Sequence, residues 1–302
     1  MSTIDPTAPE PTAPVDGHDA ATGRLLDELA ANATVAPVTR LVDGWLCKAA
    51  PGLPFRRANA VLPALGAGAD PTAVAHTLDS IEAWYRQLGQ RVLVQVSSAD
   101  PSGSALDITL AARGYRIEAP VDLLVAETAA IADAGTRAAD GLRVALEEHE
   151  VSHAHDDDVP PGAVGVVVHE GVDETWSIRY GAVHGADEVW RARTEAYGRM
   201  LAALGPSILA GAATAGDEVA AVGFAVLERG WAGIYGMGTA PAWQRQGIGG
   251  ALLGGLATEA RHRHATHLYL QVERDNPAAQ ALYRGLGFET SHGYHYRVGG
   301  AA

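Results

Sequence analysis

The stretch PAWQRQGIGGALL, from Pro241 to Leu253, places three glycines and two polar side chains just before an apolar helical pattern. A strand is predicted before it, and a helix with one apolar face is predicted from about Gly247 to His264. The first N–H groups of a helix have no partner within it and lie at the positive end of its dipole. Glycines let an anion approach these groups closely, so the stretch suits a phosphate or pyrophosphate.

This stretch differs from two familiar phosphate-binding motifs. It lacks the Gly-Lys-Ser/Thr of a P-loop and the G-x-G-x-x-G spacing of a dinucleotide-binding turn. Close packing of the helix on a sheet is the alternative explanation for glycines here. It applies most directly to Gly250, Gly254 and Gly255.

The size of the chain permits one large domain or two ordinary ones, because it has 302 residues and 47% of them are hydrophobic. No run reaches the roughly 18 apolar residues that span a bilayer. The first twenty residues lack the basic start and the apolar run of a signal peptide. Cys47 is the single cysteine, so no internal disulfide is possible and a cytoplasmic location is expected.

A formal net charge of −14 argues against binding to nucleic acid or to a membrane of anionic lipid, because both carry negative charge. We therefore expect neither partner. His153, His155 and Asp156–Asp158 have the composition of metal ligands but no strict spacing, and they fit a solvated linker. We expect no metal site.

Two runs of the chain share one order of elements. LVQVSSADPSGSALDITLAARGYRIE begins at Leu93, and LYLQVERDNPAAQALYRGLGFE begins at Leu268. Each has a strand-like run that ends in Gln-Val, a polar turn, a helical segment, and an aromatic residue after a glycine. The repetition predicts an internal duplication and two domains of similar fold.

Strands alternate with helices in both halves, which predicts an α/β layer fold. The regular pattern fails between about residues 128 and 162, where alanines precede an acidic run with two prolines. We therefore divide the chain into a disordered Pro/Ala-rich tail at 1–22, a first domain at 23–135, a linker at 136–162 and a second domain at 163–302.

The second half carries further residues in a fixed order. Gln-x-x-Gly-x-Gly at Gln244–Gly249 is followed by Asn276–Pro277, Leu282–Tyr283 and Gly287–Phe288. In these motifs the region from about residue 164 onward resembles the GNAT acetyltransferase superfamily. The first half resembles, more loosely, the two-domain GNAT proteins of high-GC bacteria, and it lacks Gln-x-x-Gly-x-Gly at the equivalent place.

The resemblance implies two GNAT-like domains in tandem, each a mixed, mostly antiparallel sheet flanked by helices, with a catalytic second domain. It also implies acetyl-CoA as co-substrate. The pyrophosphate would lie on the N–H groups from Arg245 to Gly250, and the pantetheine arm beside the strand that ends at Met237–Thr239. The residues expected to bind acetyl-CoA are Met237, Gly238, Thr239, Gln244, Arg245, Gln246, Gly247, Ile248, Gly249, Gly250, Asn276 and Tyr283.

Three of these residues have further expected roles. An N–H near Met237 would hold the thioester oxygen as it becomes an oxyanion, typically worth about 3 kcal/mol. By resemblance Tyr283 donates a proton to the departing thiolate, and its alternative is a core aromatic residue. Asn276, followed by proline, also has the pattern of a helix N-cap, and its two roles are compatible.

The acceptor is expected to be a small amine or amino-acid-like molecule that attacks the thioester directly in a ternary complex. The sequence does not identify the base, for which we considered Glu228, Glu273, Tyr235 and His295. Within segment 176–204, four residues fit either a pocket for a cation or the polar face of a helix: Asp187, Glu188, Glu195 and Tyr197. Arg56, Arg57 and Asn59 fit either packing between the domains or the lining of a groove between them.

Two other functions are compatible with the sequence, namely acetylation of a protein or peptide and acyl-CoA binding without turnover. Tyr283 favours catalysis, because a binding module would need only the pyrophosphate cradle. Both a monomer and a homodimer are compatible with the sequence.

Overall fold

The computed structural model describes residues 20–147, 164–185 and 196–299. The first half contains α1 (Ala20–Asn32), β1 (Val38–Val42), β2 (Trp45–Ala49), η1 (Arg56–Asn59), β3 (Val61–Leu62), η2 (Ala67–Ala69), α2 (Pro71–Gln87), β4 (Val92–Ser97), α3 (Gly103–Ala112), β5 (Arg116–Glu127) and α4 (Thr128–Glu147).

The second half contains β6 (Val164–Glu170), α5 (Glu174–His184), η3 (Gly205–Ser207), β7 (Ile208–Ala215), β8 (Glu218–Glu228), β9 (Trp231–Thr239), η4 (Pro241–Trp243), α7 (Ile248–His262), β10 (His267–Glu273), α8 (Pro277–Gly285) and β11 (Glu289–Gly299). Residues 196–202 are also helical. No helix in these described ranges is long and apolar enough to cross a membrane.

One mixed sheet runs through both halves, in the order β1-β2-β3-β4-β11-β5-β10-β9-β8-β7-β6. The pairs β3–β4 and β9–β10 are parallel, and the other pairs are antiparallel. The prediction of an α/β fold with a mixed, mostly antiparallel sheet is therefore confirmed.

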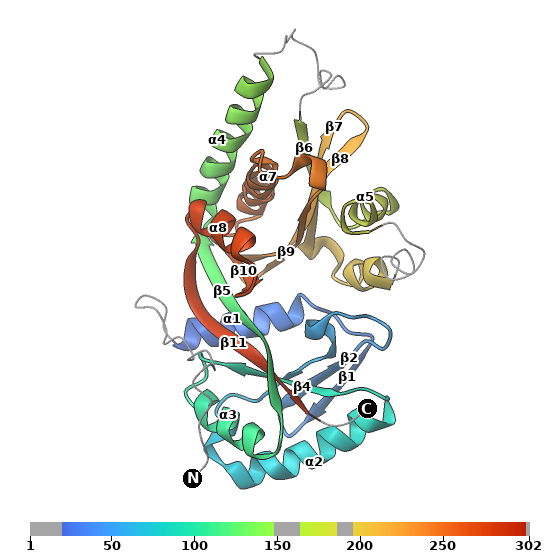
Figure 1. Ribbon diagram of the computed structural model, residues 1–302, viewed down its shortest axis with the longest axis vertical. Helices are drawn as coiled ribbons and strands as arrows, with labels where there is room; N and C mark the ends of the chain where they lie inside the picture. The colour runs from blue at the N-terminus through green and yellow to red at the C-terminus, as the bar shows by residue number, and fades with distance from the viewer. Residues whose placement is uncertain (1–19, 148–163, 186–195, 300–302) are drawn as a thin grey trace.

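The two halves exchange strands in the middle of this sheet. β5, from the first half, lies between β10 and β11 of the second half, and β11 lies between β4 and β5 of the first. Both strands are long and bent, and Figure 1 shows them running from one half into the other. Neither half could complete its sheet without a strand from the other.

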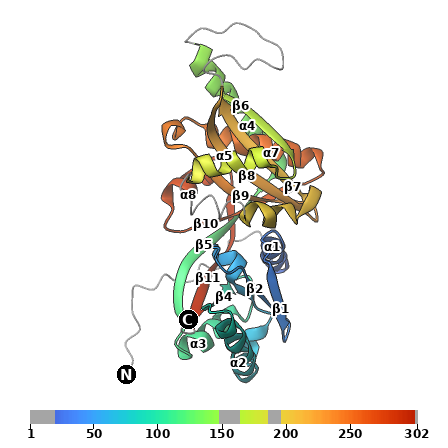
Figure 2. The ribbon, with the colours of Figure 1, turned by 90° about the vertical axis from the view of Figure 1, so that its right-hand side faces the viewer.

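Helices cover both faces of the sheet. In the second half α7, α4 and α8 lie on one face and α5 on the other (Figures 1 and 2). Apolar residues recur along α7 at helical spacing, and Leu252, Leu253 and Leu256 are fully buried against the sheet. α2 and α3 pack on the strands of the first half, where they form a separate core with β2 and β4. α1 lies between the two halves.

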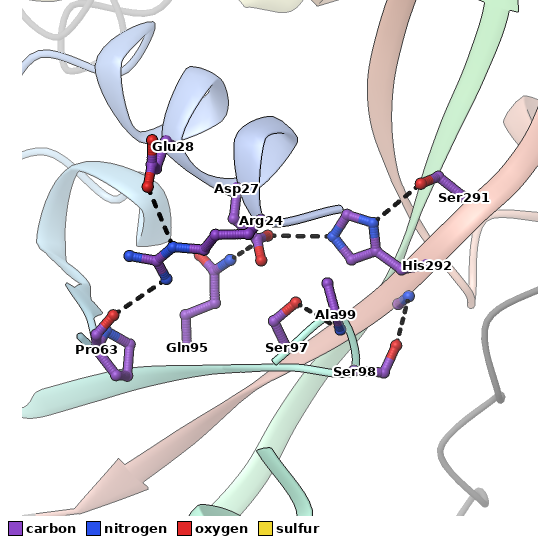
Figure 3. Close-up of polar contacts among 11 residues, drawn as sticks. Arg24, Asp27, Glu28, Pro63, Gln95, Ser97, Ser98, Ala99, Ser291 and His292 are labelled. Carbon is purple, nitrogen blue, oxygen red and sulfur yellow. Dashed lines mark hydrogen bonds and ion pairs between the residues drawn. The ribbon is translucent and has the colours of Figure 1, made fainter. Parts of the chain in front are cut away.

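A buried polar network links α1 to the central strands. The Asp27 carboxylate accepts a hydrogen bond of 2.9 Å from Gln95 on β4, and it lies 3.2 Å from His292 Nε2 on β11 (Figure 3). Ser291 lies 3.2 Å from the other ring nitrogen of His292. Because buried polar groups are costly unless paired, this network favours one placement of β11 against α1 and β4.

The expected loss of regular structure from residue 128 is wrong for residues 128–147, which form α4. α4 packs along α7, which is more than 100 residues later in the chain. The alanine-rich sequence of α4 does not reveal this partner. The two helices meet at Gly135 and Gly254, where a Cβ on Gly254 would lie 2.3 Å from Gly135 Cα. The expected linker thus begins inside a packed helix, and its residues 148–162 lie outside the described ranges.

Replacing Gly254 with alanine is expected to lower the free energy of unfolding by about 1–3 kcal/mol, because the new Cβ overlaps the backbone of Gly135. Denaturation followed by circular dichroism measures the change. Gly285→Ala is the matched control, since a Cβ there meets no atom within 4 Å. Equal stability of the two variants would contradict the close contact between α4 and α7.

Candidate functional site

Strands β9 and β10 run side by side and then separate. Their parallel pairing extends from Trp231 opposite His267 to Ile234 opposite Leu270. Beyond this point β10 stays paired with β5, and β9 stays paired with β8 as far as Thr239. In the described sheet, β9 therefore has one open edge from residue 235 to residue 239.

A bulge in β9 lies on this open edge. The pairing of β8 with β9 shifts register between Val222 and Phe224, and Gly236 has a left-handed φ of 59°. His184, at the end of α5, lies with Nε2 3.1 Å from the Gly236 carbonyl oxygen. A carbonyl can only accept a hydrogen bond, so Nε2 carries the proton. Gly238 has no room for a side chain, because a Cβ would lie 2.6 Å from the His184 ring.

The glycine stretch connects β9 to α7 through a tight turn. Arg245 and Gly247 both have left-handed backbones, with φ of 61° and 83°, and Gly247 is the N-cap of α7. The Gln244 side chain donates to the Thr239 carbonyl oxygen at 3.2 Å, and Gln246 donates to Ala242 at 2.9 Å. These two amides brace the turn from within.

The N–H groups of residues 245–250 make no hydrogen bond to backbone in the described ranges. A Cβ on Gly247 would meet no atom within 4 Å, so packing does not require glycine at this position. The left-handed backbone conformation of residue 247 is what favours glycine. The turn therefore presents free N–H groups at the positive end of a helix, an arrangement that binds phosphate. Gly254 and Gly255 pack closely against Gly135 and Val166, which fits the packing alternative for them.

A cavity of about 670 Å³ lies where β9 and β10 separate. Both halves line it, with Pro54–Arg57 from the first half and Tyr294 and Tyr296 from the exchanged strand β11. Among the predicted site residues, Met237, Asn276 and Tyr283 line the cavity; the lining does not include Gly238, Thr239, Gln244, Arg245, Gln246, Gly247, Ile248, Gly249 or Gly250.

Tyr283 borders both the cavity and the core. Its side chain is 9% exposed and packs edge-on against Phe288, with ring centroids 5.9 Å apart. Burial raises the pKa of the Tyr283 phenol to about 12. The phenol therefore stays protonated at neutral pH and can act as a donor.

Asn276 is the N-cap of α8. Its side-chain oxygen accepts a hydrogen bond of 3.1 Å from the Ala279 N–H, and Pro277 follows at the first helical position. The N-cap prediction is confirmed. Because the cap uses the oxygen, the amide nitrogen is the part of this side chain that can still donate.

Residues of η1 have two different roles. Asn59 shapes the preceding loop, since it donates to the carbonyl oxygens of Leu53 and Phe55 at 2.9 and 3.0 Å. Arg56 and Arg57 line the cavity and reach the second half, where Arg56 forms a 3.0 Å ion pair with Glu273 and Arg57 donates to Gln271. The two arginines thus both line the cavity and join the halves.

Two of the four residues considered for the base do not line the cavity. His295 lies 2.7 Å from Asp107 on α3, and Glu228 accepts a hydrogen bond of 3.0 Å from Asn32. Tyr235 lines the cavity, but burial raises its pKa to about 12, so it is not ionised at neutral pH. Glu273 lines the cavity and stays a candidate.

Sequence reasoning missed several cavity residues from distant parts of the chain. These residues are Phe55, Tyr294 and Tyr296. The Phe55 ring is tilted against Tyr197, with centroids 4.6 Å apart. Tyr294 and Tyr296 are two residues apart on β11, and their ring centroids are 5.5 Å apart. The spacing of these two tyrosines was a usable signal for a shared face. Several residues singled out in the sequence lie outside the described ranges: Asp187, Glu188, Glu195, His153, His155 and Asp156–Asp158. Within the described ranges, no cluster of His, Cys, Asp or Glu is arranged to hold a metal ion.

Comparison with protein families places this site in a known class. Residues 170–288 match the model of the acetyltransferase (GNAT) family. This region is similar to the GNAT acetyltransferases. The match covers β9, the glycine turn and α8, so the open edge and the free N–H groups both lie in the matched region.

Curated relatives match over short stretches. The [ribosomal protein bS18]-alanine N-acetyltransferase of Escherichia coli K12 is 44% identical over 55 residues, which is 18% of this chain and 37% of that protein. The N-alpha-acetyltransferase RimI of Mycobacterium tuberculosis is 43% identical over 70 residues, 22% of this chain and 42% of that protein. The chain thus spans less than half the length of these two relatives.

Solved structures resemble the whole chain in fold. A GCN5-related N-acetyltransferase from Kribbella flavida has a TM-score of 0.60 at 16% identity, over 95% of this chain and 98% of its own. A tandem GNAT protein from the clavulanic acid biosynthesis pathway has a TM-score of 0.62 at 13% identity, over 92% of this chain and 88% of its own. The chain therefore has the overall fold of a tandem GNAT protein, as predicted.

The contact between His184 and the bulge predicts a pH dependence of stability. Burial lowers the pKa of His184 below its usual 6.5. As the pH falls, the unfolded chain binds this proton before the folded chain does. The stabilisation is complete above about pH 6.5 and is lost as the pH falls toward the lowered pKa.

We expect the melting temperature of the wild-type protein to fall more steeply between pH 6.5 and pH 5 than that of His184→Phe. The phenylalanine ring can keep the stacking on Tyr180, which lies at 4.3 Å, but cannot be protonated. Differential scanning calorimetry at several pH values measures both slopes. Parallel slopes would show that His184 is not a buried neutral donor.

Proposed function

We propose that the chain is an N-acetyltransferase that uses acetyl-CoA as its co-substrate. The observation that carries the proposal is the open edge of β9 beside the free N–H groups at the start of α7. The GNAT family match and the named acetyltransferase relatives support the same activity.

The residues present fit a CoA thioester. The N–H groups of residues 245–250 would hold the pyrophosphate, with the positive end of α7 behind them. The backbone of Met237–Thr239 would pair with the pantetheine arm, and the Asn276 amide nitrogen would donate to it. When bound, acetyl-CoA supplies the activated acetyl group.

Two residues would act on the reacting atoms. The backbone N–H at Met237 or Gly238 would stabilise negative charge on the thioester oxygen, typically worth about 3 kcal/mol. His184 would help to hold that N–H in place through its contact with the bulge. Tyr283 would donate its phenolic proton to the departing thiolate.

The acceptor in this proposal is a small amine or amino-acid-like molecule. Pro54–Arg57 and the tyrosines of β11 wall the cavity on the side of the first half, which favours a small acceptor. The amine must lose a proton to attack, and Glu273 and Asp275 are the carboxylates that line the cavity and could accept it. The N-terminus of a peptide is the second candidate. One named relative is a [ribosomal protein bS18]-alanine N-acetyltransferase, and the other is an N-alpha-acetyltransferase.

Titration calorimetry with acetyl-CoA tests the donor site. We expect micromolar binding by the wild type and its loss in Gly247→Trp, whose side chain would cover the free N–H groups. Gly216→Trp is the matched control, because Gly216 also has a left-handed backbone in open space, with φ of 58°, in the turn between β7 and β8. Failure of the wild type to bind would overturn the proposal.

Tyr283→Phe is expected to lower kcat by at least about tenfold, because the proton donor is lost. The affinity for acetyl-CoA should barely change, and the phenylalanine ring should keep the packing on Phe288. Thiol release with a panel of small amines and peptide N-termini measures turnover and compares the two acceptor classes. An unchanged kcat would remove Tyr283 from the mechanism.

A further inference from the structure

We infer that Arg57 binds a carboxylate of the acceptor, so that the substrate class is amines that also carry a carboxylate, such as amino acids. This inference rests on the proposed acetyltransferase function and adds the part of the cavity that recognises the acceptor.

Arg57 is a cation without an anionic partner. Its guanidinium donates to the neutral Gln271 amide and lies over the Tyr235 ring, with Cζ 5.6 Å from the ring centroid. It forms no ion pair with a carboxylate in the described ranges. Carboxylates pair with Arg24, Arg56, Arg91, Arg113, Arg274 and Arg297. Among the described residues, exposed arginines such as Arg40 and Arg116 form no ion pair either, but these two do not line the cavity, whereas Arg57 does.

The guanidinium of Arg57 is accessible from the cavity. Its side chain is only half-buried, because it borders the cavity, and tyrosines surround it. A guanidinium is charged at every physiological pH and has five N–H donors in a planar fork. A carboxylate that enters the cavity could accept two of these N–H groups at once.

Two tyrosines of β11, Tyr294 and Tyr296, also line the cavity. The Tyr296 side chain is 2% exposed, and its hydroxyl has no hydrogen-bond partner in the described chain. Tyr296 stands edge-on to Tyr294, with ring centroids 5.5 Å apart. The Tyr294 and Tyr296 rings therefore form part of the cavity wall near Arg57.

The charges near Arg57 favour an anion despite the acidic surface. Lys48, on β2, donates to the carbonyl oxygens of Ala31 and Thr34 and not to a carboxylate. Burial and the charge of Arg57 lower the pKa of Lys48 to about 8, which places the two cations close together. The carboxylate of Glu273 on the cavity wall is already paired with Arg56 at 3.0 Å.

Arg57 and the acetyl-transfer residues share one cavity. Met237 and Tyr283 line it beside the open edge of β9, and Arg57 enters it from the first half. An amino acid could therefore place its amine near the thioester and its carboxylate at Arg57. In this arrangement the first half supplies part of the acceptor site.

Matched acceptors test the inference. We would compare kcat/KM for each of several amino acids and dipeptides with that for its C-terminal amide. The wild type is expected to favour the free carboxylate by about tenfold or more, the size typical of a hydrogen bond to a charged group. Arg57→Gln should lose most of this preference, and Arg56→Gln should retain it whatever its absolute rate.

A binding measurement gives a readout that does not depend on turnover. With CoA present, N-acetylglycine should raise the melting temperature of the wild type more than N-acetylglycinamide does, and the difference should vanish in Arg57→Gln.

The outcomes separate this inference from the proposed function. Turnover without preference for a carboxylate would overturn the inference and leave the acetyltransferase in place. Weaker acetyl-CoA binding by Arg57→Gln at unchanged stability would assign Arg57 to a phosphate of the donor and would also overturn it. Absence of acetyl-CoA binding by the wild type would overturn the proposed function, and equal thermal shifts by the two N-acetyl compounds would overturn the inference.

Discussion

The pairing of β10 with β5 is the constraint on which the site depends. Each β-strand has two edges, and beyond Leu270 one edge of β10 is held by β5 while β9 continues along β8. The other edges of β9 and β10 are left open and face each other across the cavity. Backbone N–H and C=O groups in such an opening need partners, and an extended amide-bearing chain such as pantetheine can supply them.

The strand exchange brings the first half into this site. Because β11 is inserted between β4 and β5, the tyrosines of β11 and the loop before η1 come together at the cavity. The buried contacts of Asp27 with Gln95 and His292 hold α1, β4 and β11 in one arrangement. The first half lacks a pyrophosphate motif of its own. It contributes instead part of the cavity lining and the strands that hold β11 in place.

Local signals in the sequence predicted the secondary structure around the glycine turn and α8 well. The turn from β9 to α7, the apolar face of α7 and the cap at Asn276 all depend on neighbouring residues, so short patterns contain them. α4 was missed because it packs on α7, where Gly135 meets Gly254, and these two helices are far apart in the sequence. A strand inserted from the other half cannot be read from periodicity, since alternation specifies a face but not a neighbour.

Contacts between distant parts of the chain also decide the surroundings of individual site residues. His295 has the residue type of a base, but β11 places it beside Asp107 and away from the cavity. Arg56 and Arg57 are adjacent residues of the same type. Arg56 forms an ion pair with Glu273, whereas Arg57 donates to the neutral Gln271 amide and lies over the Tyr235 ring. This difference arises from the fold, and it is what distinguishes a structural ion pair from a binding group.

Hydrogen–deuterium exchange with and without acetyl-CoA tests most directly the claim that the opening between β9 and β10 receives the donor. We expect slower exchange in peptides that cover residues 235–250, because their open edge and free N–H groups would gain partners. Peptides from β1 and β2, at the far end of the sheet, should not change. Binding of acetyl-CoA without protection of residues 235–250 would contradict the central claim.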